Sequence, residues 1–365
     1  MPTDTNPTGR QIRRAQQQGA RELSRFMEQQ ARDLRLAHEE TVAAIQADLA
    51  LLADSDGRIP LQNLRQAETV VRNNMDDLHR RQEGMVENGL RRSAGLGVAA
   101  WGGVSAAGLD PSAVRDEVLA FVREFRDANG LQLSDRLWRV SRGAREQVEN
   151  AIERAIVEGH SAAQAARDLV LRGQSVPQDL ISKRGMAAVA RIQREAGDAL
   201  LTGSMSPFFQ AERVMRTEIN RAYGETAIAA AAQHPDVIAV RFTLSPLHPE
   251  PDICDFHAEA NLHGLGPGIY PIDDHPWPAH PNTLSYLEPV FRDEITDEDR
   301  AGRQTITDYI NTQSAPKQDA ILGGQAKGWA WRQGHLSPRQ LQTPWRNIRP
   351  RLQRRGIDIP EPFAR

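Results

Sequence analysis

Apolar residues recur at helical spacings between residues 10 and 95. The first series repeats every eleven positions, at Ile12, Leu23, Leu34 and Ile45. Members of an eleven-residue repeat fall along one nearly straight stripe of a long helix. The second series repeats every seven positions, at Leu64, Val71, Leu78 and Met85. The segment DSDGRIP at 54–60 separates the series and indicates a turn. Residues 1–95 are therefore predicted to form a long helical hairpin, an assembly arm that packs on partners or self-associates.

Glycine and alanine dominate residues 96–112, which predicts a linker. Amphipathic stretches follow at about 111–128, 141–158 and 183–200, so residues 113–205 are expected to form a helical domain. Gly159 is expected to end the second of these helices, and Ser161 to cap a further short helix, SAAQAARDLVLRG.

The pattern then changes from helical to extended. Residues 206–235 predict a helix, and DVIAVRFTLS at 236–245 is alternating and β-branched, which predicts a strand that YLEPVF at 286–291 can pair with. The segment between these strands is expected to be a long loop without secondary structure. Residues 206–295 form the predicted core, and residues 296–365 a helical C-terminal segment with helices near 296–312 and 316–333. The expected fold class is mainly α with a small β element, an α+β core.

Composition narrows the class of protein. Hydrophobic residues make up 39% of the 365 residues and aromatic residues only 5%, which favours a helical, partly extended protein over one large core. No run of eighteen apolar residues is present, so no membrane segment is expected. The single cysteine excludes an internal disulfide framework. Because the first residues lack the apolar segment of a secretory signal, we expect a soluble, intracellular protein.

Charge is distributed unevenly toward the C-terminus. The stretch RDEITDEDR at 292–300 is acidic, whereas residues 321–365 are strongly basic. The candidate contact residues in this basic tail are Arg346, Arg349, Arg351, Arg354 and Arg355. Such a tail is typical of a contact with DNA or with an acidic partner. The alternative is that the tail packs on the acidic stretch of its own chain.

Residues 248–286 contain five histidines and the only cysteine of the chain. Cys254 and His257 form a C-x-x-H pair that can reach one tetrahedral ion, with zinc as the candidate metal. His280, or alternatively His275 or His263, is a candidate for the remaining ligands, and Asp252 is a candidate oxygen ligand. Histidines beside carboxylates are also used in acid–base or metal-assisted catalysis. The third interpretation is structural, since prolines stiffen the loop and its polar side chains bond backbone groups that no strand ladder satisfies.

The helix before the predicted strand carries RTEINRA at 216–222. In one interpretation, Glu212 with Arg216 and Glu218 with Arg221 are ordinary solvent-exposed helix pairs. In the other, Arg216 and Asn220 lie one helical turn apart and hydrogen-bond the backbone of the following loop. The candidate residues of this structural clamp are Arg216, Thr217, Glu218, Asn220 and Arg221.

Taken in order, RTEINRA, SPLHPEPDICD, GPGIYP, PAHPN and EPV resemble the head-morphogenesis, or minor head protein, family of tailed bacteriophages. The resemblance covers about residues 206–291, with similar segments on both sides, and excludes the N-terminal hairpin. It implies a minor capsid component that associates with the portal vertex, is needed for prohead assembly, and is not an established enzyme. The family's motif positions in this chain are Arg216, Thr217, Glu218, Asp252, Cys254, His280 and Pro281. Many relatives have cysteines just after HPN, which implies a zinc-binding loop, whereas this chain has Thr283 and Ser285.

The resemblance implies a structural adaptor at the portal vertex. Its expected partners are the portal protein, other capsid or scaffold proteins and double-stranded DNA, the last through the arginine tail. No cofactor is expected apart from the zinc considered above. The expected location is the host cytoplasm during assembly, then the prohead or virion. The rival hypotheses are a metal-dependent nuclease or toxin-like effector that uses the histidine-rich loop, and a plain coiled-coil scaffold.

Overall fold

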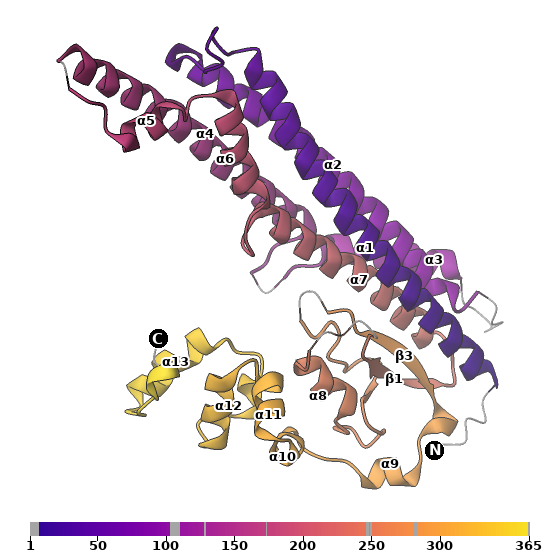
Figure 1. Cartoon of the computed structure of the whole chain (residues 1–365). Helices are drawn as coiled ribbons and strands as arrows, with labels where there is room; N and C mark the ends of the chain where they lie inside the picture. The colour runs from indigo at the N-terminus through magenta and orange to yellow at the C-terminus, as the bar shows by residue number, and fades with distance from the viewer. Residues whose placement is uncertain are drawn as a thin grey trace. The chain divides into compact units, whose positions relative to one another are not determined.

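The computed structural model describes residues 7–102, 110–127, 129–172, 174–245, 248, 250–280 and 283–363 (Figure 1). It is mainly helical with one small antiparallel sheet, which confirms the predicted fold class. The chain divides into two compact units. Met1–Ser24, Ala94–Val118 and Asn220–Arg365 form the sheet unit, and Arg25–Ser93 and Leu119–Ile219 form the helical unit. Within the described ranges, every helix is too short or too polar to span a bilayer.

The helical unit consists of helices whose apolar stripes face one another. Its elements are most of α1 (Pro7–Ala50) and α2 (Leu64–Ala99), all of α4 (Leu133–Leu171), α5 (Gln178–Arg184) and α6 (Val189–Leu201), and the first half of α7 (Pro207–Ala232). Ile45 of the first predicted stripe and Val71 and Leu78 of the second are buried in one cluster with Val148 of α4. The predicted N-terminal hairpin of long helices is thus confirmed.

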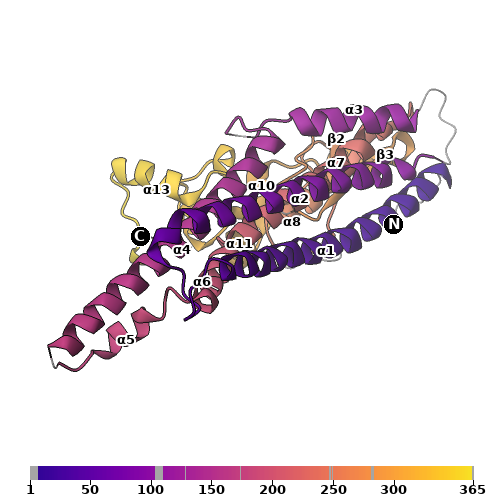
Figure 2. The same ribbon diagram turned by 90° about the horizontal axis from the view of Figure 1, so that it is seen from above.

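Helix α3 (Pro111–Glu124) runs beside α2 (Figure 2). In the helical unit, Arg123 of α3 and Glu87 of α2 form an ion pair at 2.5 Å. The predicted helix at 111–128 is therefore present, although it ends four residues earlier.

Helix α4 passes through Gly159 without interruption, so the predicted helix end at Gly159 and the predicted cap at Ser161 are wrong. The glycine has a packing role instead. A Cβ on Gly159 would lie 2.5 Å from the backbone nitrogen of Ala187, in the connection between α5 and α6. The absence of a side chain therefore allows that connection to approach α4 closely.

Helix α2 likewise continues through Gly95 and Gly97 to Ala99, where the sequence predicts the start of a linker over 96–112. Residues 103–109, the middle of that predicted linker, lie outside the described residues. A Cβ on Gly97 would collide with the backbone of Tyr223 in α7, whereas a Cβ on Gly95 would have no neighbour within 4 Å. Gly97 therefore sets how closely α2 and α7 approach in the sheet unit.

The sheet has β1 (Val237–Thr243) at its centre, with β2 (Ile269–Pro271) and β3 (Tyr286–Phe291) antiparallel on either side. The predicted strand and its predicted partner at 286–291 are both confirmed. The expectation of a loop without secondary structure between them is wrong, because the segment contains β2 and the helix α8 (Ile253–Glu259). Both elements are short, and β2 lies within GPGIYP at 266–271. The prolines and glycines of this motif are typical of turns, so the sequence gives no strand pattern there.

The first turns of α1 belong to the sheet unit. Ile12 is buried in one apolar cluster with Phe291 of β3. The next residue, Arg13, pairs with Glu294 at 2.5 Å. Residues 1–95 therefore do not form a separate arm, since α1 and α2 contribute to both compact units.

Short helices make up the C-terminal part of the sheet unit: α9 (Asp297–Ala301), α10 (Ile306–Thr312), α11 (Ala315–Leu322), α12 (Gln325–Arg332) and α13 (Trp345–Arg354). The two longer helices predicted at 296–312 and 316–333 are thus each divided in two. The second is divided at Gly323 and Gly324, whose φ angles are 83° and 134°. These left-handed values end a helix and favour glycine.

Gly97→Ala is expected to destabilise the sheet unit by about 1–3 kcal/mol, because the added methyl group overpacks the contact between α2 and α7. Gly95→Ala on the same helix is the matched control. It should stabilise by up to about 1 kcal/mol, because it only raises helix propensity. Urea denaturation followed by circular dichroism measures both changes, and equal effects would contradict the close approach at Gly97.

Candidate functional site

The histidine-rich segment is anchored by the N-terminus of α8. The Asp252 carboxylate accepts a hydrogen bond from the backbone N–H of Cys254 at 2.6 Å, and the Asp255 carboxylate accepts one from the N–H of Asp252 at 2.7 Å. This reciprocal arrangement is a capping box, which satisfies N–H groups that have no partner inside the helix. The sequence DICD thus starts the helix and holds Cys254 in its first turn.

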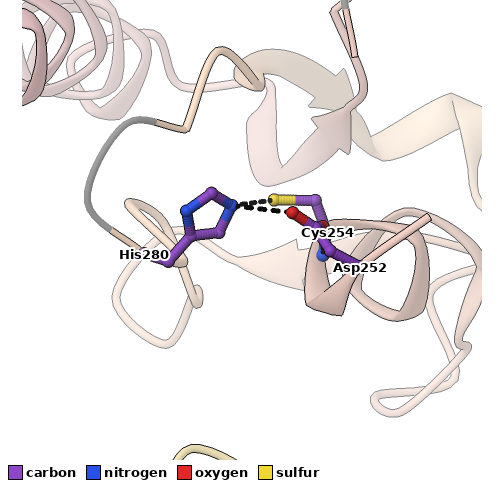
Figure 3. A group of neighbouring side chains, drawn as sticks. All are labelled: Asp252, Cys254 and His280. Atoms are coloured by element: carbon purple, nitrogen blue, oxygen red, sulfur yellow. Dashed lines mark hydrogen bonds and ion pairs between the residues drawn. The ribbon is translucent and has the colours of Figure 1, made fainter. Parts of the chain in front are cut away.

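Three side chains converge at this helix start (Figure 3). Nε2 of His280 lies 3.1 Å from Sγ of Cys254 and 3.1 Å from Oδ2 of Asp252. One candidate ligand atom from each residue lies within 4.8 Å of the others. Cys254 is buried, whereas Asp252 and His280 are partly exposed. The structure therefore brings together three of the four residues named as candidate metal ligands.

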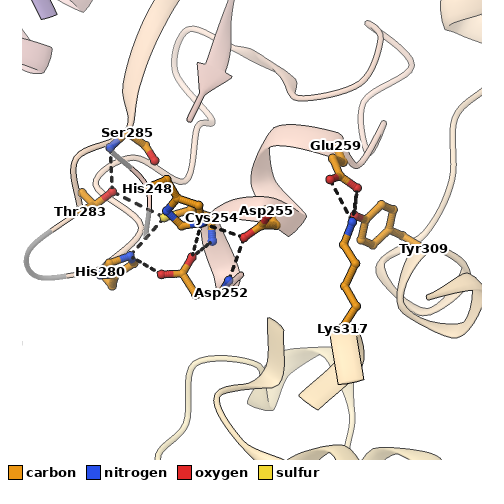
Figure 4. Close-up of polar contacts among 10 residues, drawn as sticks. All are labelled: His248, Asp252, Cys254, Asp255, Glu259, His280, Thr283, Ser285, Tyr309 and Lys317. Carbon is orange, nitrogen blue, oxygen red and sulfur yellow. Dashed lines mark hydrogen bonds and ion pairs between the residues drawn. The ribbon is translucent and has the colours of Figure 1, made fainter. Parts of the chain in front are cut away.

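Further polar contacts surround the three residues (Figure 4). Nε2 of His248 lies 2.9 Å from Oδ2 of Asp255. Oγ1 of Thr283 lies 3.5 Å from Sγ of Cys254 and accepts a hydrogen bond from the N–H of Ser285 at 3.3 Å. Thr283 thus contacts the Cys254 thiol.

The other end of α8 is tied to the C-terminal helices (Figure 4). The Glu259 carboxylate accepts a hydrogen bond from the Tyr309 hydroxyl of α10 at 2.6 Å. It also pairs with the Lys317 ammonium of α11 at 2.7 Å. Both ends of this seven-residue helix are therefore held by polar side chains.

His257 does not join the metal-ligand candidates, although the C-x-x-H spacing predicts that it does. Its Nδ1 lies 3.4 Å from the Tyr270 hydroxyl, which donates to the His257 carbonyl at 3.1 Å. The His257 ring packs instead against the rings of Phe242, Phe256 and Tyr270. Burial lowers the pKa of His257 to about 4, so its imidazole is neutral at pH 7.

The three converging residues fit an open zinc site by the type of their donor atoms. Burial acts to raise the pKa of Asp252, but hydrogen bonds from His280 and from the N–H of Cys254 outweigh it and lower that pKa. Asp252 is therefore a carboxylate at neutral pH. Among the described residues, no fourth His, Cys, Asp or Glu joins the group. Three protein ligands leave a position for water, as in catalytic zinc sites, whereas structural zinc sites are closed by four.

Asn220 of α7 holds the chain that leads into β3. Its Nδ2 donates to the carbonyl of Thr283 at 2.9 Å and to that of Ser285 at 3.5 Å. Arg216, the other half of the clamp hypothesis, instead lies 3.7 Å from Glu212 within the same helix. The contact between this helix and the loop backbone thus comes from the amide of Asn220.

Glu218 is completely buried, and its Oε1 lies 2.6 Å from the guanidinium of Arg136 in α4. The interpretation of Glu218 as the solvent-exposed partner of Arg221 is therefore wrong. Loss of one member of a buried ion pair costs about 3–5 kcal/mol, because the other charge is left without compensation. Thr217 donates to the carbonyl of Arg213 at 2.7 Å, within its own helix. Thr217 and Glu218 thus serve the packing of the helical unit.

Helix α13 separates its apolar and basic side chains. Ile348 and Leu352 are buried. Four of the candidate arginines are exposed and the fifth, Arg349, is half-buried; the exposed ones are Arg346, Arg351, Arg354 and Arg355. The side chains named for a DNA or partner contact are thus largely accessible.

Comparisons with known proteins give no further information on the site. No family model, no curated protein and no solved structure matches the chain. Any statement about function therefore rests on the geometry above and on the motifs of the sequence.

Buried His257 predicts that acid destabilises the sheet unit. Its pKa of about 4 in the folded protein lies below the ordinary value of 6.5. Between these values the unfolded chain binds more protons than the folded one, so the free energy of unfolding falls as the pH drops from 7 to 4. One pKa unit corresponds to about 1.4 kcal/mol, so His257 accounts for a fall of about 3 kcal/mol in the free energy of unfolding over this pH range.

His257→Phe should therefore flatten the dependence of unfolding free energy on pH. Phe242→Leu is the matched control, since the Phe242 ring also packs against the His257 ring and carries no ionisable group, so the dependence should persist in it. Urea denaturation at a series of pH values gives both profiles. A variant profile identical to that of the wild type would show that burial of His257 is not the cause.

Proposed function

We propose that the protein is a minor head, or head-morphogenesis, protein of a tailed bacteriophage and acts as a structural adaptor at the portal vertex during prohead assembly. One observation carries the proposal: side-chain contacts link His280 to helix α8 and Thr283 to helix α7. His280 contacts Asp252 and Cys254 at the start of α8, and Asn220 of α7 holds the carbonyl of Thr283. Asp252, Cys254 and His280 are motif positions of the resemblance, and Asn220 lies in its RTEINRA helix.

Because these contacts order the loop before binding, the loop is suited to dock on a partner protein. Ordering a backbone residue costs about 1–2 kcal/mol, so a loop that becomes ordered only on binding loses affinity. In this loop, side-chain contacts and the capped helix α8 supply the order beforehand. The surface can therefore meet the portal or a capsid protein in one fixed shape.

The exposed arginines of α13 and of its C-cap residue support a second contact, with packaged double-stranded DNA. The accessible residues are Arg346, Arg351, Arg354 and Arg355. Arginines that neutralise phosphates release counterions, so this contact weakens as the salt concentration rises. The adaptor would then lie where the portal and the DNA are both within reach, in the prohead or the virion.

Co-expression with the portal protein encoded by the same genome tests the adaptor role. The wild-type chain should co-purify with the portal, and Asn220→Ala should lower its recovery severalfold, because the carbonyls of Thr283 and Ser285 lose their donor. Glu212→Ala, which removes only the helix pair with Arg216, should not change the recovery. A wild-type chain absent from both the portal and purified proheads would rule out the role.

A second candidate function is favoured by the three donors Asp252, Cys254 and His280. It is a metal-dependent nuclease or toxin-like effector. Zinc held by these residues would supply an activated water for phosphodiester hydrolysis. This candidate predicts about one zinc per chain and DNA cleavage that His280→Ala abolishes. Elemental analysis that finds less than about a tenth of an equivalent would exclude it.

A further inference from the structure

A second trio of potential metal ligands lies beside the first trio, which consists of Asp252, Cys254 and His280 (Figure 4). One ligand atom from each of His248, Asp252 and Asp255 lies within 4.8 Å of the others. Nε2 of His248 is 2.9 Å from Oδ2 of Asp255 and 3.9 Å from Oδ1 of Asp252. The first trio and this second trio therefore share one residue, Asp252.

The Asp252 carboxylate directs its two oxygens at two different histidines. Oδ1 lies 3.9 Å from Nε2 of His248, and Oδ2 lies 3.1 Å from Nε2 of His280. A carboxylate that bridges two metal ions likewise gives one oxygen to each ion, beside the other ligands of that ion. Ions in two-metal sites are about 3.5–4 Å apart, a distance that one bridging carboxylate spans.

The hydrogen bonds of the capping box leave room for metal binding at both carboxylates. Oδ1 of Asp252 accepts from the N–H of Cys254 at 2.6 Å, and Oδ2 of Asp255 accepts from the N–H of Asp252 at 2.7 Å. A carboxylate has two oxygens with about four lone-pair positions, so each can accept an N–H and still bind a cation. The capping box thus orients both carboxylates before any cation arrives.

Charge and access both favour a cation in the second trio. Within the described ranges, the ion-pair partners of Asp252 and Asp255 are histidines rather than arginines or lysines. The exposed side-chain fractions are 16% for His248, 38% for Asp252 and 14% for Asp255, so a cation can enter from solvent. A divalent ion would replace the proton shared between imidazole and carboxylate and would balance two negative charges. Imidazole and carboxylate together suit Zn²⁺ and similar divalent ions.

We propose that these residues bind two divalent cations of the zinc type, bridged by the Asp252 carboxylate. Cys254 and His280 complete the first site, and His248 and Asp255 complete the second. The inference rests on the zinc site of the second candidate function, to which it adds another ion and its ligands. Bridged ions hold the attacking and leaving oxygens of a phosphodiester, so the backbone phosphate of a nucleic acid is the class of ligand that fits the pair.

Titration of the full-length protein with Co²⁺ alone, followed by absorption and electron paramagnetic resonance, tests the pair. The first equivalent should give a thiolate-to-cobalt absorption band, because the soft sulfur of Cys254 is in the first site. The second equivalent should add no such band. It should lower the resonance signal severalfold below that of two isolated ions, since a bridging carboxylate couples their spins.

The other outcomes separate this inference from the zinc site on which it rests. Saturation at one equivalent would overturn the second site and leave the first. Two equivalents with the full resonance signal of isolated ions would overturn the bridge and with it the proposal. No bound cobalt would overturn the proposal together with the zinc site. The adaptor role is tested separately, by co-purification with the portal protein.

Substitutions then assign the second ion to its ligands. His248→Ala should lower bound zinc from two ions per chain to one, measured by elemental analysis after dialysis, and retain the cobalt–thiolate band. His263→Ala, in the same segment but outside both trios, is the matched control and should bind two ions. Asp252→Asn should abolish the spin coupling, although asparagine remains a good N-cap for α8. Two coupled ions in His248→Ala would show that the proposal is wrong. If circular dichroism shows that His248→Ala does not fold, two coupled ions in Asp252→Asn would count against it equally.

Discussion

The connection between β1 and β3 must satisfy its backbone hydrogen-bonding groups largely without a strand ladder, and the sheet unit depends on this constraint. Buried peptide groups that lack partners are costly, so side chains take the place of neighbouring strands. Trp277 donates to the carbonyl of Ser285 at 2.8 Å, beside the contact from Asn220. Asn261 accepts from the N–H of Gly264 at 2.9 Å and donates to a carbonyl of α9 at 2.7 Å. The candidate site is therefore part of the same network that allows the connection to be buried.

Within this network, burial disfavours the charged forms of both Asp252 and His257, but only at Asp252 do hydrogen bonds outweigh it. Asp252 receives hydrogen bonds from His280 and from the backbone of Cys254, and these stabilise its charged form. At His257, desolvation among aromatic rings outweighs the attraction of the Asp252 charge, so the imidazole stays neutral. Helix α8 thus presents a charged, hydrogen-bonded end toward His280 and an uncharged side toward the rings of Phe242 and Tyr270. The two regions differ in chemistry although only a few residues separate them.

Periodic features of this protein could be predicted from its sequence, and features that depend on distant neighbours could not. The stripes through Ile45 and Val71 repeat regularly, so their burial follows from local spacing. Gly159 looks like a helix end for an equally local reason, yet its role is set by Ala187, whose position only the folded chain determines. The candidate site divides in the same way. Its histidines, cysteine and carboxylates indicate a candidate metal or catalytic site. Spacing along the chain, however, cannot show that His280 rather than His257 reaches Cys254.

The placement of the first turns of α1 in the sheet unit has a consequence for how the chain folds during its synthesis. Arg13 and Glu294 are 281 positions apart, and the Tyr223 hydroxyl bonds the carbonyl of Gln16 across 207 positions. Contacts of such high sequence separation form slowly, because a large loop must close before they are gained. Residues of α1 leave the ribosome before β3 is translated, so their contacts with Phe291 and Glu294 form only later. Until then the apolar side chain of Ile12 lacks the neighbour that Phe291 supplies in the folded protein, and exposed apolar surface of this kind favours aggregation.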